Sequence, residues 1–169
     1  MFTLSSAAFG DGDIIPDKYV EDSHVSPPLQ WENAPEGAES FYLVMTDQDI
    51  PLQYRENLQR GFIHWVACIP GSVSELAEGA SPGNMPSGSK EFKTDFVTFS
   101  TPGYGSHYGG PSPPDASQRY TFRLFALKSV PDLPADADFG DVGAALLYNT
   151  IDVARLIGVY GAASMQMAG

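Results

Sequence analysis

The sequence predicts a mostly β protein, a β-sandwich with one or two short helices near its C-terminus. The 17 glycines and 14 prolines are spread through all 169 residues, which is typical of an all-β domain with irregular loops. Short runs of aromatic and β-branched residues between these breaks suit a pleated sheet. Helical spacing of apolar residues is confined to the last part of the chain. No repeat, low-complexity tract or linker is found, so we expect residues 1–169 to form a single domain.

Four segments are strand candidates. Phe41–Met45 is a continuous apolar run between polar residues, which predicts a strand covered on both faces. Phe62–Ile69 is similar and ends at a Pro-Gly turn signal. Phe96–Phe99 is short and aromatic, and we expect a strand there as well. Arg119–Leu127 is the longest candidate, and its side chains alternate between two faces.

The predicted helices lie close to the end of the chain. Asp141–Leu147 and Thr150–Ile157 carry apolar residues at near-helical spacing. Asp141 and Asn149 are suitable N-cap residues for them, and Gly158 would end the second helix.

The charge of the chain excludes several classes of partner. Nine basic residues against 21 acidic ones give a net charge of −12. Nucleic-acid affinity depends mainly on basic charge, so we expect no nucleic-acid partner. The same charge disfavours docking on anionic lipid. No signal peptide or long apolar run is seen, so the sequence predicts a cytoplasmic protein without membrane insertion.

Metal and cofactor motifs are absent from the sequence. The single cysteine, Cys68, excludes an intrachain disulfide and zinc sites built on paired cysteines. We expect Cys68 to be a buried strand residue. His24, His64 and His107 lie too far apart for zinc-protease spacing, and we expect the first and last of these on loop surfaces. Neither a phosphate loop nor a nucleophile elbow occurs, so no cofactor and no metal are expected.

Three segments place polar chemistry at or near the ends of apolar strands. They are Asp47–Pro51, His64–Trp65 and Tyr108–Pro114. In the third segment, Gly110 followed by Pro111 leaves a backbone N–H that a ligand can approach closely on a stiff rim.

Each of these segments also has a purely structural interpretation. Asp47 and Asp49 suit an ordinary turn, because aspartate side chains bond to nearby backbone amides. A single histidine on an apolar strand, such as His64, is more often a hydrogen-bonded core residue than a ligand. Asp49 is the expected ion-pair partner of Arg119, since a charge that enters an apolar strand needs one when it is buried.

Six segments occur in order along nearly the whole chain and together form a specific pattern. They are Phe9-Gly10-Asp11-Gly12 with Ile15-Pro16, Ser26-Pro27-Pro28-Leu29-Gln30-Trp31, Asp47-Gln48-Asp49-Ile50-Pro51, His64-Trp65-Val66 with Ile69-Pro70, Gly110-Pro111-Ser112-Pro113-Pro114 with Arg119-Tyr120, and Ala154-Arg155-Leu156-Ile157-Gly158-Val159-Tyr160. This pattern resembles the phosphatidylethanolamine-binding protein family, in particular its bacterial Raf-kinase-inhibitor-like branch.

The resemblance implies a sandwich of two antiparallel sheets with a helical segment near the C-terminus. It also implies a small, non-catalytic pocket that accepts phosphate, phosphorylated head groups and similar anions. Carried over position by position, the ligand-binding residues would be Asp47, Pro51, His64, Gly110, Pro111 and Tyr120, with Phe62 as a nearby aromatic. Tyr108 and Gln118 are further candidates for the pocket rim.

The chain departs from the family pattern at the pocket. Gln118 stands where the family usually has a histidine, and glutamine donates hydrogen bonds but carries no charge. Loss of that histidine should weaken anion binding and its acid dependence. Gln48 and Ile50 also differ from the family's usual proline and alanine.

Three functional hypotheses follow from these residues. The first is a non-enzymatic binding protein with an anion pocket that modulates a partner protein. The second is a protein-interaction module, inhibitory toward a kinase or protease as in some relatives, in which the pocket is vestigial. The third is a hydrolase that uses Asp47 and His64 as a dyad with Ser106 or Ser112 as nucleophile. No catalytic motif of fixed spacing supports this third hypothesis. The resemblance also allows a homodimer.

Overall fold

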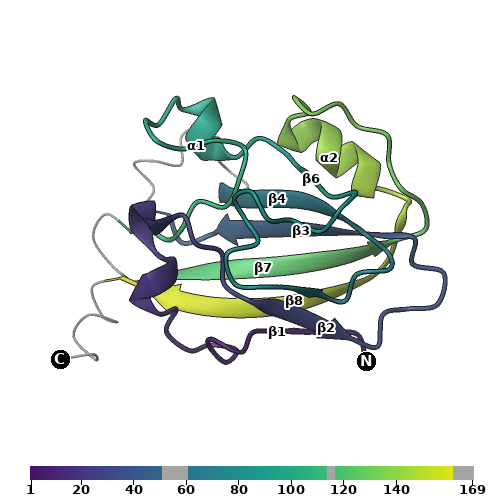
Figure 1. The fold of residues 1–169 in the computed structure, drawn as a ribbon, viewed down its shortest axis with the longest axis horizontal. Helices are drawn as coiled ribbons and strands as arrows, with labels where there is room; N and C mark the ends of the chain where they lie inside the picture. The colour runs from purple at the N-terminus through teal and green to yellow at the C-terminus, as the bar shows by residue number, and fades with distance from the viewer. Residues whose placement is uncertain (51–60, 114–116, 162–169) are drawn as a thin grey trace.

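The computed structural model describes residues 1–50, 61–113 and 117–161. The protein folds into two antiparallel sheets. The larger sheet has the strand order β6 (Lys90–Glu91), β4 (Phe62–Pro70), β3 (Ser40–Asp47), β7 (Gln118–Leu127) and β8 (Thr150–Tyr160). The smaller sheet has the order β1 (Thr3–Ser5), β2 (Leu29–Glu32) and β5 (Glu75–Leu76). Figure 1 shows the long strands side by side, with α2 (Phe139–Leu146) over one end. The predicted fold class is confirmed.

Strand β3 is the centre of the larger sheet, and all of its residues are buried. Leu43 and Met45 face the core between the two sheets, whereas Tyr42 and Val44 face a second core on the other side. A strand that is apolar on both faces must be covered on both, as the continuous run in the sequence indicates. The strands expected around Phe62–Ile69 and Arg119–Leu127 are confirmed as β4 and β7.

The second core lies beneath α2. Val142 of this helix packs with Tyr42, Val66 and Cys68, so the lone cysteine is a buried strand residue as expected. The helix begins after Asp138, whose side chain accepts from the amide of Asp141 at 2.9 Å. The Asp141 carboxylate in turn accepts from the Asp138 amide, forming a capping box. The helix therefore starts earlier than predicted, with Asp141 inside its first turn.

The second predicted C-terminal helix is wrong. Thr150–Ile157, with Asn149 as its expected N-cap, is the first part of the edge strand β8. From Ala154 onward, alternate residues are buried, which is the period of a strand. Gly158 ends no helix but lies within β8, where a Cβ would come 2.4 Å from Ile15. The near-helical spacing of apolar residues in this segment is a weak local preference, and hydrogen-bonded pairing with β7 along the whole of β8 overrides it.

The strand expected at Phe96–Phe99 is also wrong, because Asp95–Thr98 forms the short helix α1. The Asp95 carboxylate accepts from the Ile63 amide of β4 at 2.7 Å, which anchors the start of α1 on the sheet. Two further single-turn helices, η1 (Asp17–Tyr19) and η2 (Glu21–Ser23), precede β2. A short aromatic run carries too little periodicity to tell strand from helix.

Candidate functional site

The candidate site is a pocket at the end of β3. Asp47, the last residue of this strand, lies opposite Phe62 of β4 and opposite Tyr120 of β7. Antiparallel pairing thus brings the end of one strand beside the starts of two others. The pocket has a volume of about 220 Å³ and is lined by Asp47, Ile50, Phe62, His64, Phe96, Ser112, Gln118 and Tyr120.

The imidazole of His64 is fixed by the loop that passes over β4. Its Nδ1 donates to the Gly109 carbonyl at 2.8 Å, and the Gly109 amide donates to the His64 carbonyl at 3.0 Å. The side chain is 4% exposed. This reciprocal pair of bonds sets both the position of the ring and the nitrogen that carries its proton.

The histidine is uncharged at neutral pH. Burial lowers the pKa of His64 to about 4, although the carbonyls of Gly109 and Gly110 and the carboxylate of Asp95 act in the opposite direction. Because Nδ1 carries the proton given to Gly109, Nε2 holds a lone pair and can accept a hydrogen bond. The ring therefore acts as an acceptor toward a neighbouring group.

Asp47 and Tyr120 supply the remaining polar groups of the inner pocket. The Asp47 side chain is 3% exposed, and its Oδ1 accepts from the Asp49 amide at 2.9 Å. Burial, and then the nearby Asp47 carboxylate, raise the pKa of Tyr120, so its hydroxyl keeps its proton. The Tyr120 hydroxyl lies 3.4 Å from the Gln118 side-chain oxygen.

Aromatic rings form the wall around His64. Phe96 meets the imidazole edge to face with centroids 5.0 Å apart, and Tyr120 does the same at 5.3 Å. Phe62 packs against Phe96 at 4.8 Å, and Tyr104 stacks on the outside of Phe96 at 4.1 Å. Phe96 was not expected in the pocket wall, because helix α1 positions it there and no local sequence signal marks it.

The glycine-proline loop supports the pocket from behind. A Cβ on Gly110 would lie 2.5 Å from the Tyr19 carbonyl oxygen and 2.9 Å from the Val20 Cα, so only glycine fits there. The Glu21 amide donates to the Pro111 carbonyl at 2.7 Å. Neither Gly110 nor Pro111 is a lining residue, so the close approach expected at Gly110 is made by the chain's own η1–η2 segment.

Among the predicted rim residues, Phe62 and Gln118 line the pocket and Tyr108 does not. Tyr108 is fully buried against Trp65, with centroids 5.3 Å apart, and its hydroxyl donates to the Tyr19 carbonyl at 2.7 Å. Its large ring fills the core between the sheets, which removes it from the rim. The predicted ligand-binding residue Pro51 lies outside the described residues.

Arg119 and Asp49 fasten the loop after β3 to the start of β7. The guanidinium donates to the carboxylate through Nε at 2.7 Å and Nη2 at 2.8 Å. The Arg119 amide donates to Asp49 as well, at 2.9 Å. Arg119 is exposed, so the bond geometry, rather than burial of the charge, holds this pair together.

His24 and His107 were expected on loop surfaces, but both are half-buried. Their rings lie edge to face with centroids 5.3 Å apart, and His24 also meets Tyr104 at 4.8 Å. They therefore pack against the outer side of the aromatic wall.

Metal-binding clusters and membrane-spanning helices are absent from the described part of the chain. It contains no group of three or more His, Cys, Asp or Glu residues placed to hold a metal ion. None of its helices combines the length and apolar character needed to cross a membrane.

Sequence comparison places this geometry among known relatives. Residues 5–161 match the family model described as phosphatidylethanolamine-binding protein. A UPF0098 protein of Methanothermobacter thermautotrophicus is 36% identical over 160 residues, which cover 93% of this chain and 97% of that protein. A UPF0098 protein of Aquifex aeolicus is 36% identical, with 92% of this chain and 85% of that protein covered.

Solved structures agree with this assignment. Escherichia coli YbcL, described as a member of the mammalian PEBP family, superposes with a TM-score of 0.81 at 27% identity, covering 95% of this chain and 98% of YbcL. The PEBP homologue CT736 of Chlamydia trachomatis superposes with a TM-score of 0.80 at 30% identity, covering 95% and 97%. The chain therefore belongs to the phosphatidylethanolamine-binding protein family, in the branch that includes these bacterial proteins.

Proposed function

We propose that this protein is a non-enzymatic binding protein whose pocket accepts a small, singly charged anion that still carries a proton, such as dihydrogen phosphate or the monoanion of a phosphorylated head group. The observation that carries the proposal is the bond from His64 Nδ1 to the Gly109 carbonyl. It leaves Nε2 of the uncharged ring as an acceptor, and a P–OH group is the matching donor.

Neutral donors would complete the anion site. The Tyr120 hydroxyl remains protonated, and the Gln118 side-chain amide is a second neutral donor among the lining residues. Asp47 would accept from a second ligand proton or from an ammonium group. The described lining residues include no lysine or arginine, and the chain carries −12 overall, so affinity must come from short contacts. A singly charged ligand fits this balance better than a dianion.

The geometry favours binding over hydrolysis. In a serine–histidine–aspartate triad the histidine Nδ1 donates to a carboxylate, which stabilises the imidazolium that forms during the reaction. Here Nδ1 of His64 donates to a neutral carbonyl, and the low pKa of His64 disfavours the imidazolium. Ser112 lines the pocket but makes no hydrogen bond with His64 among the described contacts. Ser106 is not a lining residue.

Nuclear magnetic resonance titration tests the proposal. We expect phosphate and phosphoethanolamine to shift the His64, Gln118 and Tyr120 signals at pH 5.5. Both should bind several-fold more weakly at pH 8, where their phosphate groups are mainly dianionic, since a phosphate monoester loses its second proton near a pKa of about 6. Sulfate, which carries no proton at either pH, should bind weakly throughout. Unshifted His64 and Gln118 signals at millimolar phosphate would rule the proposal out.

Matched variants separate the pocket from the rest of the molecule. Gln118→Ala removes a polar group from the pocket, whereas Gln30→Ala makes the same change on an exposed position of β2. Only the first should alter the phosphate affinity. Equal effects of the two variants would contradict a site at this pocket.

A protein-interaction role at the same rim is the second candidate. Phe99 is 50% exposed, and its ring stacks on the lining residue Phe62 with centroids 6.2 Å apart. An exposed aromatic beside a small pocket suits a contact with a partner protein whose side chain enters the pocket. In that case Phe99→Ala would weaken partner binding and leave phosphate binding unchanged.

A further inference from the structure

Two arginines face each other on the outer side of the larger sheet. Arg123 of β7 and Arg155 of β8 are direct partners in the strand register, so their side chains project from the same face with Cβ atoms about 5 Å apart. Arg155 is exposed and Arg123 is half-buried. Like charges placed directly opposite each other destabilise a sheet. The repulsion between the two guanidinium groups therefore lowers the stability of the sheet.

Neither arginine has an acidic partner among the described residues. The Nη1 of Arg123 donates to the Thr46 hydroxyl at 3.3 Å, and the ion pairs of the described chain are made by other residues. Burial and the charge of Arg155 both lower the pKa of Arg123. The chain has 21 acidic residues against nine basic ones, so the missing partner does not reflect a shortage of carboxylates.

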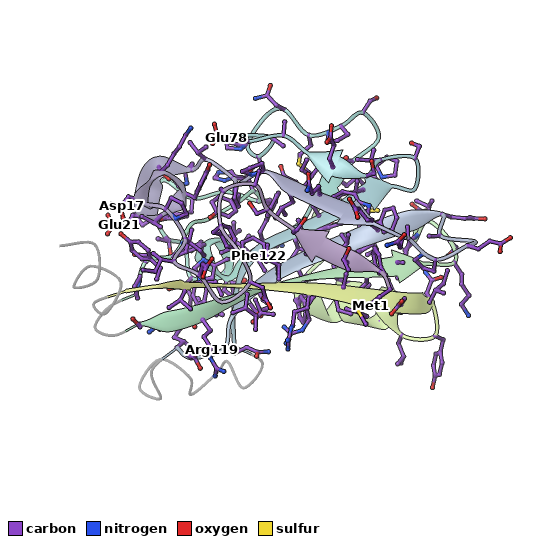
Figure 2. All side chains as sticks on the ribbon, turned by 90° about the horizontal axis from the view of Figure 1, so that it is seen from below. Met1, Asp17, Glu21, Glu78, Arg119 and Phe122 are labelled. Carbon is purple, nitrogen blue, oxygen red and sulfur yellow. The ribbon has the colours of Figure 1, made fainter. Side chains whose placement is uncertain are left out.

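Aliphatic side chains flank the two guanidinium groups. Val153 is 41% exposed and Ile157 is half-buried, and each lies two residues from Arg155 on the same face of β8. These four residues, Arg123, Arg155, Val153 and Ile157, form what we call the β7–β8 face. In Figure 2, Arg119 marks the same side of the strands, and Phe122, a core residue, lies on the other.

The edge of β8 is closed to an added strand at the positions next to this face. The Val153 amide donates to the Asp152 side chain at 2.8 Å. The Ile157 amide donates to the Asp11 side chain at 2.9 Å, and its carbonyl accepts from the Gly12 amide at 2.8 Å. These contacts occupy the strand edge at Val153 and Ile157, on either side of Arg155.

We propose that the β7–β8 face docks an extended segment of a partner protein that presents both carboxylates and aliphatic side chains on one of its faces. Such a segment would place negative charge between the two guanidinium groups and would cover Val153 and Ile157. This interaction is separate from the pocket and goes beyond the function proposed for it.

Charge favours an acidic protein segment over a second copy of the chain, nucleic acid or anionic lipid as the partner of the β7–β8 face. A second copy related by a two-fold axis at this face would bring the same arginines together from both chains. Nucleic acid and anionic lipid surfaces carry many negative charges, which two arginines on a protein with a net charge of −12 cannot balance, whereas a short segment needs only one or two carboxylates opposite the arginines. Asp17, Glu21 and Glu78 lie on the other side of the sheet from Arg119 (Figure 2), and neither arginine of the face forms an ion pair with a carboxylate in the described part of the chain.

The test uses a defined peptide and two charge-matched variants. Terminally blocked Val-Ser-Glu-Ser-Val-Ser-Glu-Ser-Val, whose valines and glutamates share one face when the chain is extended, is titrated into ¹⁵N-labelled protein at low salt, and we expect shifts at residues 121–125 and 153–157. Arg155→Glu should weaken binding by about tenfold, since one charge-assisted pair becomes a repulsion. Lys128→Glu makes the same charge change at an exposed position beyond the end of β7 and should change binding less than twofold.

Arg155→Glu is expected to fold, because a carboxylate opposite Arg123 forms a favourable cross-strand pair. The lysine counterpart of the peptide should cause no shifts. Equal binding of both peptides, shifts only at other residues, or no shifts at millimolar peptide would overturn the proposal. A dimer in sedimentation, or binding to phosphatidylglycerol vesicles, that Arg155→Glu abolishes would overturn it as well, because the face would then have another occupant.

Discussion

Strand β7 carries one arginine at its start and another in its middle, and the two have opposite electrostatic surroundings. At the start, Arg119 binds the carboxylate of Asp49 through three hydrogen bonds beside the pocket. Four residues on, and on the same face, Arg123 meets Arg155, and neither forms an ion pair with an acid in the described part of the chain. A charge near a strand end is reached by the loop that leaves the neighbouring strand, whereas a charge in the middle of a sheet has only the residues that the register places opposite it.

This contrast extends to the surroundings of the two regions. In the pocket, Asp47, His64 and Tyr120 are buried, and their bonds and charges are set by close neighbours. On the β7–β8 face, solvent reaches the charged groups and weakens their interactions. Changes in the pocket region should therefore alter stability much more than changes on the face.

Acid should produce the largest effect, through His64. Its pKa is about 4 in the folded protein and near 6.5 when unfolded, so the unfolded chain binds more protons between these values. The stability contribution is complete above pH 6.5 and is lost as the pH falls toward 4, by roughly 3 kcal/mol. Urea denaturation as a function of pH measures it.

A variant without the titrating ring provides the control for this acid effect. His64→Phe keeps an aromatic ring in the wall but removes the proton uptake. The loss of stability between pH 6.5 and 4 should be smaller in the variant by the amount assigned to His64. Parallel pH profiles for the two proteins would show that His64 is not buried in its neutral form.

The next effect comes from the loop behind His64. Gly110→Ala should destabilise the protein by about 2–3 kcal/mol, because its Cβ would collide with the backbone of Tyr19 and Val20, which cannot move aside as a flexible side chain can. Gly143→Ala in α2 is the matched control, since its Cβ meets nothing within 4 Å. That variant should be as stable as the parent or slightly more so, because alanine favours helix. Equal stability of both variants in urea would contradict the close packing of Gly110.

The smallest effect is expected on the β7–β8 face. Arg155→Glu replaces a repulsion with an attraction to Arg123 and should raise stability by about 0.5 kcal/mol at low salt. The gain should shrink in high salt, and Lys128→Glu should not show it. Thermal unfolding at two salt concentrations measures the difference. A loss of stability in Arg155→Glu would mean that the two arginines are held apart by contacts other than their own charges.

The sequence predicted the central strands well because their signal is strong and local. The apolar run Phe41–Met45 predicted a strand buried on both faces, and β3 is one. The segments around Asp47, His64 and Tyr120 were expected at one site, and all three residues line the pocket. Their order along the chain, together with the resemblance to a known family, was sufficient for this.

Other features could not be read from local pattern. The apolar residues of Thr150–Ile157 have near-helical spacing, but pairing with β7 made this segment part of a strand. Phe96 entered the pocket wall through a one-turn helix, and Tyr108 entered the core. These outcomes depend on segments far away in the chain.

Residue types and their periodicity by themselves determined the class of fold, the main strands and several of the polar side chains that line the pocket. Tertiary contacts then decided the charge of His64 through burial and the Gly109 carbonyl, and the juxtaposition of Arg123 with Arg155 through strand register. The physical reason is that apolar periodicity acts over a few neighbouring residues, whereas desolvation and cross-strand partners come from segments tens of residues apart.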